Sequence, residues 1–127
     1  MAHTGIFATS AECDHFTPAQ VSSVYTAEAY RNTYCTCSES LINDQSNYNF
    51  SDVYSSLNVD VKKILTMMSC CIVSIITING DKSGFFSENE ALNSIEFLLT
   101  LYNQGLNKLM KDKSDGVSWV SGTGVNP

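Results

Sequence analysis

Apolar residues recur at helical spacing in three long segments of the chain. Between about Val59 and Ile78 they recur every three or four positions, and further apolar residues fill most of the remaining faces. A helix that is apolar nearly all round is typically buried. This segment is therefore predicted to lie at the centre of the fold, and Gly80 is well suited to follow its end.

The clearest amphipathic pattern lies in the last segment, from about Glu88 to Asp112. Ser87 and Glu90 form an S-x-x-E capping box at its start. Three lysines near its end oppose the negative end of the helix dipole, which gives this small basic cluster a structural explanation. The predicted core-facing residues are Leu92, Ile95, Leu98, Leu99, Tyr102, Leu106, Leu109 and Met110.

A first long helix is predicted from Pro18 to about Ile42. Thr17 is a candidate N-cap, and Pro18 would occupy the first helical position, where its missing N–H does no harm. The apolar stripe is imperfect because Glu28 and Arg31 fall on or near it. Their i,i+3 spacing lets them pair on the helix surface. They could equally face a neighbouring subunit, and both alternatives stay open.

Polar residues separate the first two long helices. The stretch from Asn43 to Asn49 is rich in turn-forming residues, and a short helix or turn is expected between Ser51 and Leu57. Asn58 is a candidate N-cap for the central helix. The whole pattern predicts a mainly α fold, a small bundle of three long helices and one short helix.

Both ends of the chain lack the helical period. Residues 1–16 are expected to form an extended N-terminal arm and residues 114–127 an extended C-terminal tail, with a helical domain at 17–113. The tail holds the single tryptophan in a stretch with the composition of a short strand. That tryptophan either folds back on its own domain or anchors the tail to a partner. The candidate subunit or partner interface therefore comprises Glu28, Arg31, Val117, Trp119 and Val120.

Composition narrows the class of protein. The 127 residues suit one domain, and 16% charged residues is low against the roughly 25% of globular chains. A formal net charge of −6 with one arginine disfavours nucleic-acid binding and binding to anionic membrane surfaces.

The uncharged run from Ile64 to Ile78 is shorter than the roughly 20 residues of a membrane span. With no recognisable signal peptide, a soluble chain from a reducing compartment, with no membrane partner, is expected.

The five cysteines are an odd number, which disfavours a disulfide framework. Cys35 with Cys37, and Cys70 with Cys71, lie in helical patterns, where adjacent side chains point about 100° apart and cannot easily ligate one metal. We expect reduced, small, buried cysteines and no metal site or cofactor. A thiol-based redox or metal-binding helical protein using these four residues is the alternative.

No motif in the sequence builds an active site. The two histidines, His3 and His15, both lie in the expected arm, where a fixed catalytic geometry is hard to maintain. Nucleophile elbows, phosphate loops, dinucleotide fingerprints and zinc-protease motifs do not occur in the sequence. A non-enzymatic function in binding or assembly is favoured, with a small helical enzyme as a remaining alternative.

Short sequence segments, called words below and lying mostly from Leu41 onward, carry a family resemblance. The words are Ala27-Glu28-Ala29, Ile42-Asn43, Tyr48 to Asp52, Tyr54 to Leu57, Asn58 to Lys62, Ile64-Leu65, Asp81, Ser83-Gly84-Phe85, Ser87, Glu90-Ala91 and Leu109 to Lys113. In these words the chain resembles the head–tail connector (adaptor) proteins of tailed bacteriophages. The relatives often have Trp where this chain has Phe50.

This resemblance implies a structural protein of the virion neck that is assembled in the host bacterial cytoplasm. It implies a homo-oligomer, a dodecameric ring beneath the portal protein, that extends the DNA channel and docks the next neck or tail protein. DNA would pass the acidic wall without specific binding. A closed ring needs two different matching faces. Another neck component, a stopper or tail terminator, remains an alternative and would be richer in β-strand.

Overall fold

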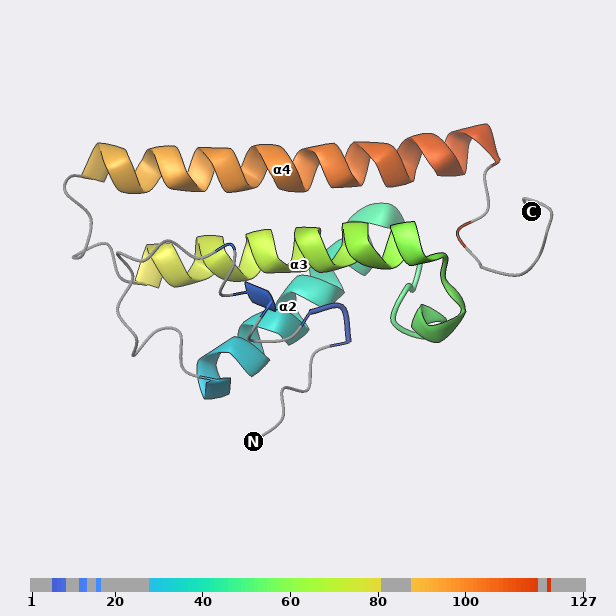
Figure 1. Cartoon of the computed structure of the whole chain (residues 1–127), viewed down its shortest axis with the longest axis horizontal. Coiled ribbons are helices and arrows are strands. Elements are labelled where there is room, and N and C mark those ends of the chain that lie inside the picture. The colour runs from blue at the N-terminus through green and yellow to red at the C-terminus, as the bar shows by residue number, and fades with distance from the viewer. Residues whose placement is uncertain are drawn as a thin grey trace.

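A computed structural model describes residues 6–8, 12, 13, 16, 28–80, 88–116 and 119. In this part of the chain three long helices occur, α2 (Glu28–Ser46), α3 (Val59–Gly80) and α4 (Glu88–Asp115), with one short 3-10 helix, η1 (Tyr54–Ser56). No strand occurs among the same residues (Figure 1). The predicted mainly α bundle of three long helices and one short helix is confirmed.

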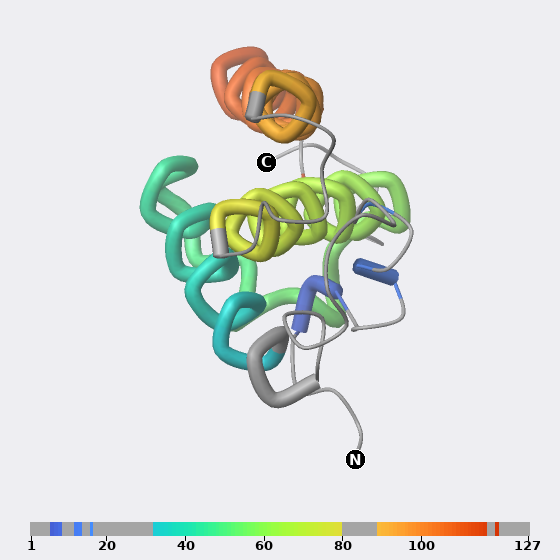
Figure 2. The backbone as a smooth tube through the Cα atoms, turned by 90° about the vertical axis from the view of Figure 1, so that its left-hand side faces the viewer, coloured from blue at the N-terminus to red at the C-terminus, as the bar shows by residue number. Residues whose placement is uncertain are grey.

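The central position predicted for α3 is also confirmed. In the side view and the end view, α3 lies between α2 and α4, with α4 running along it and α2 crossing it obliquely (Figures 1 and 2). Leu65 and Met68 of α3 are completely buried. At Gly105, α4 approaches α3 so closely that an added Cβ would lie 2.6 Å from Met68 Cγ. The helix that is apolar on most faces is thus the one with a neighbour on two sides.

The boundary of α2 corrects one prediction. The polar stretch from Asn43 was expected to be a break, but α2 continues through Ser46. Ser46 is buried, and its Oγ donates to the carbonyl of Ile42 at 2.8 Å, so its hydroxyl is satisfied within the helix. The helix ends where Asn47 adopts a positive φ of 55°, as is common for the residue after a helix. The predicted start of this helix, at residues 17–27, lies outside the described residues.

The other two long helices begin where the sequence predicts and end slightly later. Asn58 O accepts the backbone N–H of Lys62 at 2.9 Å at the start of α3. The end of α4 lies three residues beyond Asp112, where Gly116 has a positive φ of 76° and its N–H donates to Lys113 O. The capping residue Ser87 lies outside the described residues.

The described parts of the N-terminal arm pack on the chain's own helices. The backbone N–H groups of Ile6 and Phe7 donate to one carboxylate oxygen of Glu39 in α2, the second at 3.0 Å. Thr66 Oγ1 of α3 donates to Phe7 O at 2.6 Å. The buried Phe7 ring stacks on Tyr54 of η1, with centroids 5.6 Å apart. Residues that the pattern placed outside the helical domain therefore complete its packing.

Candidate subunit interface

The tryptophan that was a candidate partner anchor is part of this chain's own core. Trp119 is 7% exposed, and its ring lies 4.8 Å, centroid to centroid, from those of Tyr48 and Phe50. Its carbonyl accepts the N–H of Asn58 at 2.8 Å. Burial of a large indole between two aromatic rings is favourable. Trp119 therefore folds back on its own domain and is not presented to a partner in this conformation, which corrects its assignment to an interface.

The remaining four predicted interface residues stay untested. Glu28 and Arg31 lie in the first turn of α2, but their side chains lie outside the described residues. Val117 and Val120 also lie outside them. Trp119 packs beyond the other end of α2, a helix of 19 residues. At about 1.5 Å per residue the helix is roughly 28 Å long, so the structure does not bring the Glu28 end of α2 and Trp119 together.

Three of the six large apolar side chains that are exposed among the described residues, Leu92, Phe97 and Leu99, lie on α4. This outer helix packs along α3 through one buried face and stands apart from most of α2 (Figures 1 and 2). Leu98, Tyr102 and Leu109 form that buried face. Leu92 and Leu99, which the sequence pattern assigned to the same face, are 41% and 46% exposed. The apolar arc of α4 is thus wider than α3 can cover.

Two separate flanks of α4 carry these exposed groups. On one flank, a leucine strip consists of exposed Leu92 and Leu99 with half-buried Ile95 and Leu106. The other flank presents Phe97, which is 63% exposed. At about 100° per residue, Phe97 lies about 150° around the helix from the exposed leucines. One helix therefore offers apolar surface in two nearly opposite directions.

The geometry of α2 explains why the leucine strip is uncovered. Contacts between α2 and α4 involve the C-terminal half of α4, where the Tyr102 hydroxyl donates to Gln45 and Lys113 Nζ donates to Ser46 O at 3.2 Å. From there α2 slopes away from α4 toward its own N-terminus (Figure 1). Leu92 and Leu99 lie in the N-terminal half of α4, beyond the reach of these contacts.

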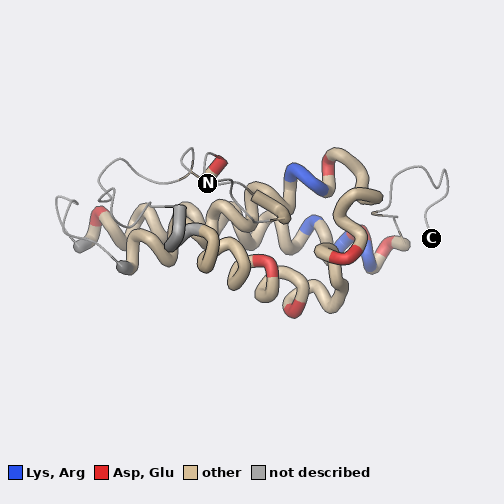
Figure 3. Tube along the Cα trace, turned by 90° about the horizontal axis from the view of Figure 1, so that it is seen from below, with Lys and Arg blue, Asp and Glu red and all other residues tan. Residues whose placement is uncertain are grey.

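The N-terminal half of α4 carries acidic residues, Glu88, Glu90 and Glu96, and no basic residue in its sequence. Figure 3 shows long uncharged stretches of the trace, with the lysines of α4 near its C-terminal end. There Lys108 pairs with Asp112 at 2.7 Å and Lys111 with Asp115 at 3.0 Å, both within the helix. Such i,i+4 pairs have small energies and satisfy the cations locally. The exposed flanks of α4 are therefore suited to contact with protein rather than with phosphate groups.

Four of the five cysteines are buried as expected, and one is not. Cys13, Cys35 and Cys70 share a small buried cluster, and Cys71 is buried nearby, whereas Cys37 is exposed. The pKa of Cys70 is raised by its hydrogen bond with Cys13 and by burial. Burial also raises the pKa of Cys71 to about 12. While they stay buried, thiols with raised pKa values are poor nucleophiles.

The metal-binding alternative needs ligands that converge. Cys37 is exposed whereas Cys35, Cys70 and Cys71 are buried, so the four residues named for it do not share one environment. Among the described residues, no group of three or more His, Cys, Asp or Glu side chains is arranged to hold a metal ion. Cys13, which the sequence left outside the set, joins Cys35 and Cys70 only through the tertiary fold.

One helix of the described chain is long and apolar enough to span a membrane. The segment Val59–Asn79 has 21 residues and a mean hydropathy of 1.8. It is longer than the uncharged run considered from sequence, because the helix includes its charged first turns. The buried central helix of a soluble bundle has the same length and composition, and 56% of the window is buried here. This segment is weak evidence for a membrane span.

Phe97 was not among the predicted site residues, and Leu92 and Leu99 are exposed although the pattern predicted them in the buried face. The sequence signal for Phe97 was available, because it is a large apolar residue in an otherwise polar sector of α4.

Comparison of the chain with protein-family models, curated proteins and solved structures finds no match in any of the three.

Proposed function

We propose that this chain is a structural ring subunit, and specifically a head–tail adaptor of a tailed-bacteriophage neck. The observation that carries the proposal is the pair of exposed apolar flanks on α4, Phe97 on one side and the leucine strip on the other. Exposed apolar groups that are concentrated in this way are typical of protein interfaces. The adaptor assignment itself rests on the sequence resemblance.

Closed rings need a heterologous interface, in which one face of a subunit meets a different face of the next. The two flanks of α4 differ in shape, since one presents a single aromatic ring and the other a row of aliphatic side chains. We therefore assign Phe97 of one copy to the leucine strip of its neighbour. Phenylalanine buries a large apolar area and is favoured in the core of interfaces.

The words that carry the adaptor resemblance encode a compact tertiary unit in this chain. Asn43 Oδ1 accepts the N–H of Phe50 at 3.0 Å, and Asn49 Nδ2 donates to Asp52 at 2.9 Å. Phe50 then packs on Trp119. These contacts give the shared words a structural reason. A net charge of −6 suits a channel wall along which DNA slides without being held.

The helical content of the described residues favours an adaptor over a stopper or tail terminator, which would be richer in strand. The test is to mix the purified chain with the portal protein of its own phage and to examine the complex by negative-stain electron microscopy. We expect a ring stacked on the portal. A chain that remains monomeric with and without portal would contradict the proposal.

A substitution separates the interface from the fold. Phe97→Asp should prevent ring formation, whereas Ser40→Asp, which introduces the same charge at an exposed position of α2, should leave it intact. Equal loss of rings in both variants would assign the effect to charge alone and would contradict the role of Phe97. Far-UV circular dichroism provides the check that both variants keep the helical fold.

A further inference from the structure

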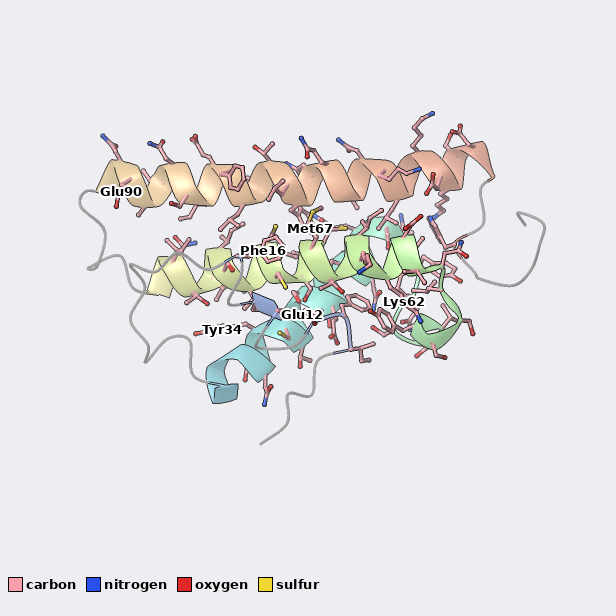
Figure 4. All side chains as sticks on the ribbon, viewed as in Figure 1. Glu12, Phe16, Tyr34, Lys62, Met67 and Glu90 are labelled. Atoms are coloured by element: carbon pink, nitrogen blue, oxygen red, sulfur yellow. The ribbon has the colours of Figure 1, made fainter. Side chains whose placement is uncertain are left out.

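Three buried thiols from three separate segments meet beside the N-terminal arm. Cys13 comes from the arm, Cys35 from α2 and Cys70 from α3, and all three are completely buried in one cluster with Ala8 and Val73. The thiols of Cys13 and Cys70 are joined by a hydrogen bond. Figure 4 shows the side chains of this region, with Glu12 and Tyr34 labelled on the side of α3 away from α4.

We propose that Cys13 and Cys70 form an oxidisable dithiol, which reacts with a low-molecular-weight disulfide and closes into a disulfide that fixes the N-terminal arm to α3. We select this pair because both thiols lie in the same completely buried cluster and because they link the arm to the central helix. Cys35 and Cys71 are the competing buried thiols, and exposed Cys37 does not belong to the cluster. This inference does not rest on the proposed ring function.

The arm controls access to the pair. Both thiols are completely buried, so an oxidant reaches them only when the described arm residues around Cys13 separate from α3. Among the described contacts of the arm, the N–H groups of Ile6 and Phe7 donate to Glu39, and the Phe7 carbonyl accepts from Thr66. Opening a short segment of this kind requires less free energy than unfolding a helix of the core. Cys13 leaves with the arm, so it is the residue that meets the oxidant first.

The chemistry proceeds by two thiol–disulfide exchanges. The Cys13 thiolate attacks one sulfur of the small disulfide, forms a mixed disulfide, and releases one small thiolate, which takes up a proton. While the arm is open, the Cys70 thiol loses its proton to solvent, and the Cys70 thiolate attacks the Cys13 sulfur as the arm returns. The bond to the small thiol breaks, the Cys13–Cys70 bond forms, and the second small thiolate leaves and is protonated. Two protein thiols are oxidised and one small disulfide is reduced to two thiols.

The test uses the full chain with Cys37→Ser, which removes the exposed thiol. Reduced protein is incubated with excess glutathione disulfide, and its mass and non-reduced peptide map are measured. The expected product lacks two hydrogens, retains no glutathione, and yields a Cys13–Cys70 cross-linked peptide. Failure to form an intramolecular disulfide in the folded protein, or a cross-link from Cys35 or Cys71, would overturn the assignment.

Two matched variants and one rate sharpen the test. In the same background, Cys70→Ala should stop at a glutathione adduct on Cys13, whereas Cys35→Ala should still cross-link. Thr66→Val removes a hydrogen bond to the arm and should accelerate cross-linking roughly fivefold, as expected for one lost bond. Cross-linking that is equally fast in this variant would contradict control by the arm. The oxidised chain should melt on the order of 10 °C higher, because the new bond closes a long loop.

Discussion

On one side of α3, small hydroxyl and thiol side chains pack against α2 beneath the N-terminal arm, whereas on the other side α4 packs alone through large apolar residues. The α2 side contains Ser38 and Ser69, whose hydroxyls lie 2.7 Å apart, and the arm closes it with Phe7. The α4 side leaves Leu92 and Phe97 exposed. The chain therefore completes one side of its core by itself, and we infer that copies of the chain complete the other.

The largest effect is expected at the aromatic cluster that joins the tail to the core. Trp119→Ala should lower the free energy of unfolding by about 3–5 kcal/mol, because it leaves a large cavity between Tyr48 and Phe50. Trp119→Phe should have a much smaller effect, since Trp119 Nε1 has no hydrogen-bond partner among the described residues to lose. Chemical denaturation measures both. Equal stability of wild type and Trp119→Ala would contradict the placement of the tail.

The next largest effect is a difference in thiol reactivity between exposed Cys37 and the four buried cysteines. In the native chain at pH 8, exposed Cys37 should react with an alkylating reagent at least about a hundredfold faster than the four buried cysteines. Raised pKa values favour the unreactive thiol form of Cys70 and Cys71 below those values, so their reactivity should increase as the pH rises. Mass spectrometry after timed quenching counts the modified residues. Several fast thiols would show that the arm does not cover its side of the core.

A smaller effect is expected at the hydroxyl pair between α2 and α3. Ser38→Ala and Ser69→Ala should each reduce stability by about 1 kcal/mol. The double variant should lose less than the sum, because each single change removes the same shared bond. Thermal and urea unfolding of the four proteins complete the cycle. Strict additivity would show that the two hydroxyls act independently.

The smallest effect on stability is expected at the exposed flanks of α4. Phe97→Lys and Leu99→Asp should each change the free energy of unfolding of the isolated subunit by less than about 1 kcal/mol, since both side chains are largely exposed. Measurements at a concentration where the chain is monomeric avoid any contribution from assembly. A loss as large as that of Trp119→Ala would place these residues in the core.

The starts of α3 and α4 could be predicted because local sequence determines them. Val59 follows the capping residue Asn58, and Glu88 follows a capping-box serine, so both helices begin where the pattern indicates. The end of α2 was missed because Ser46 bonds within the helix, which makes a polar residue compatible with it. The composition of this stretch, which is rich in turn-forming residues, does not reveal that the Ser46 hydroxyl bonds to the helix backbone.

The parts that could not be predicted depend on contacts between distant residues. Nothing near Phe7 in the sequence indicates that Thr66 and Glu39 hold its backbone. Likewise, periodicity shows that Leu92 and Leu99 are apolar, but not whether a second helix covers them. Their exposure follows from the direction of α2, which only the tertiary structure gives (Figure 1).

The central claim, a heterologous contact between Phe97 and the leucine strip, is tested most directly by complementation. Phe97→Lys and Leu99→Asp each damage one of the two faces and leave the other intact. Sedimentation of each variant alone should show no closed ring and weakened association. An equimolar mixture should associate again, because intact faces meet and the introduced lysine faces the introduced aspartate. A mixture that sediments as the separate variants do, or disruption by only one of the two substitutions, would contradict the account.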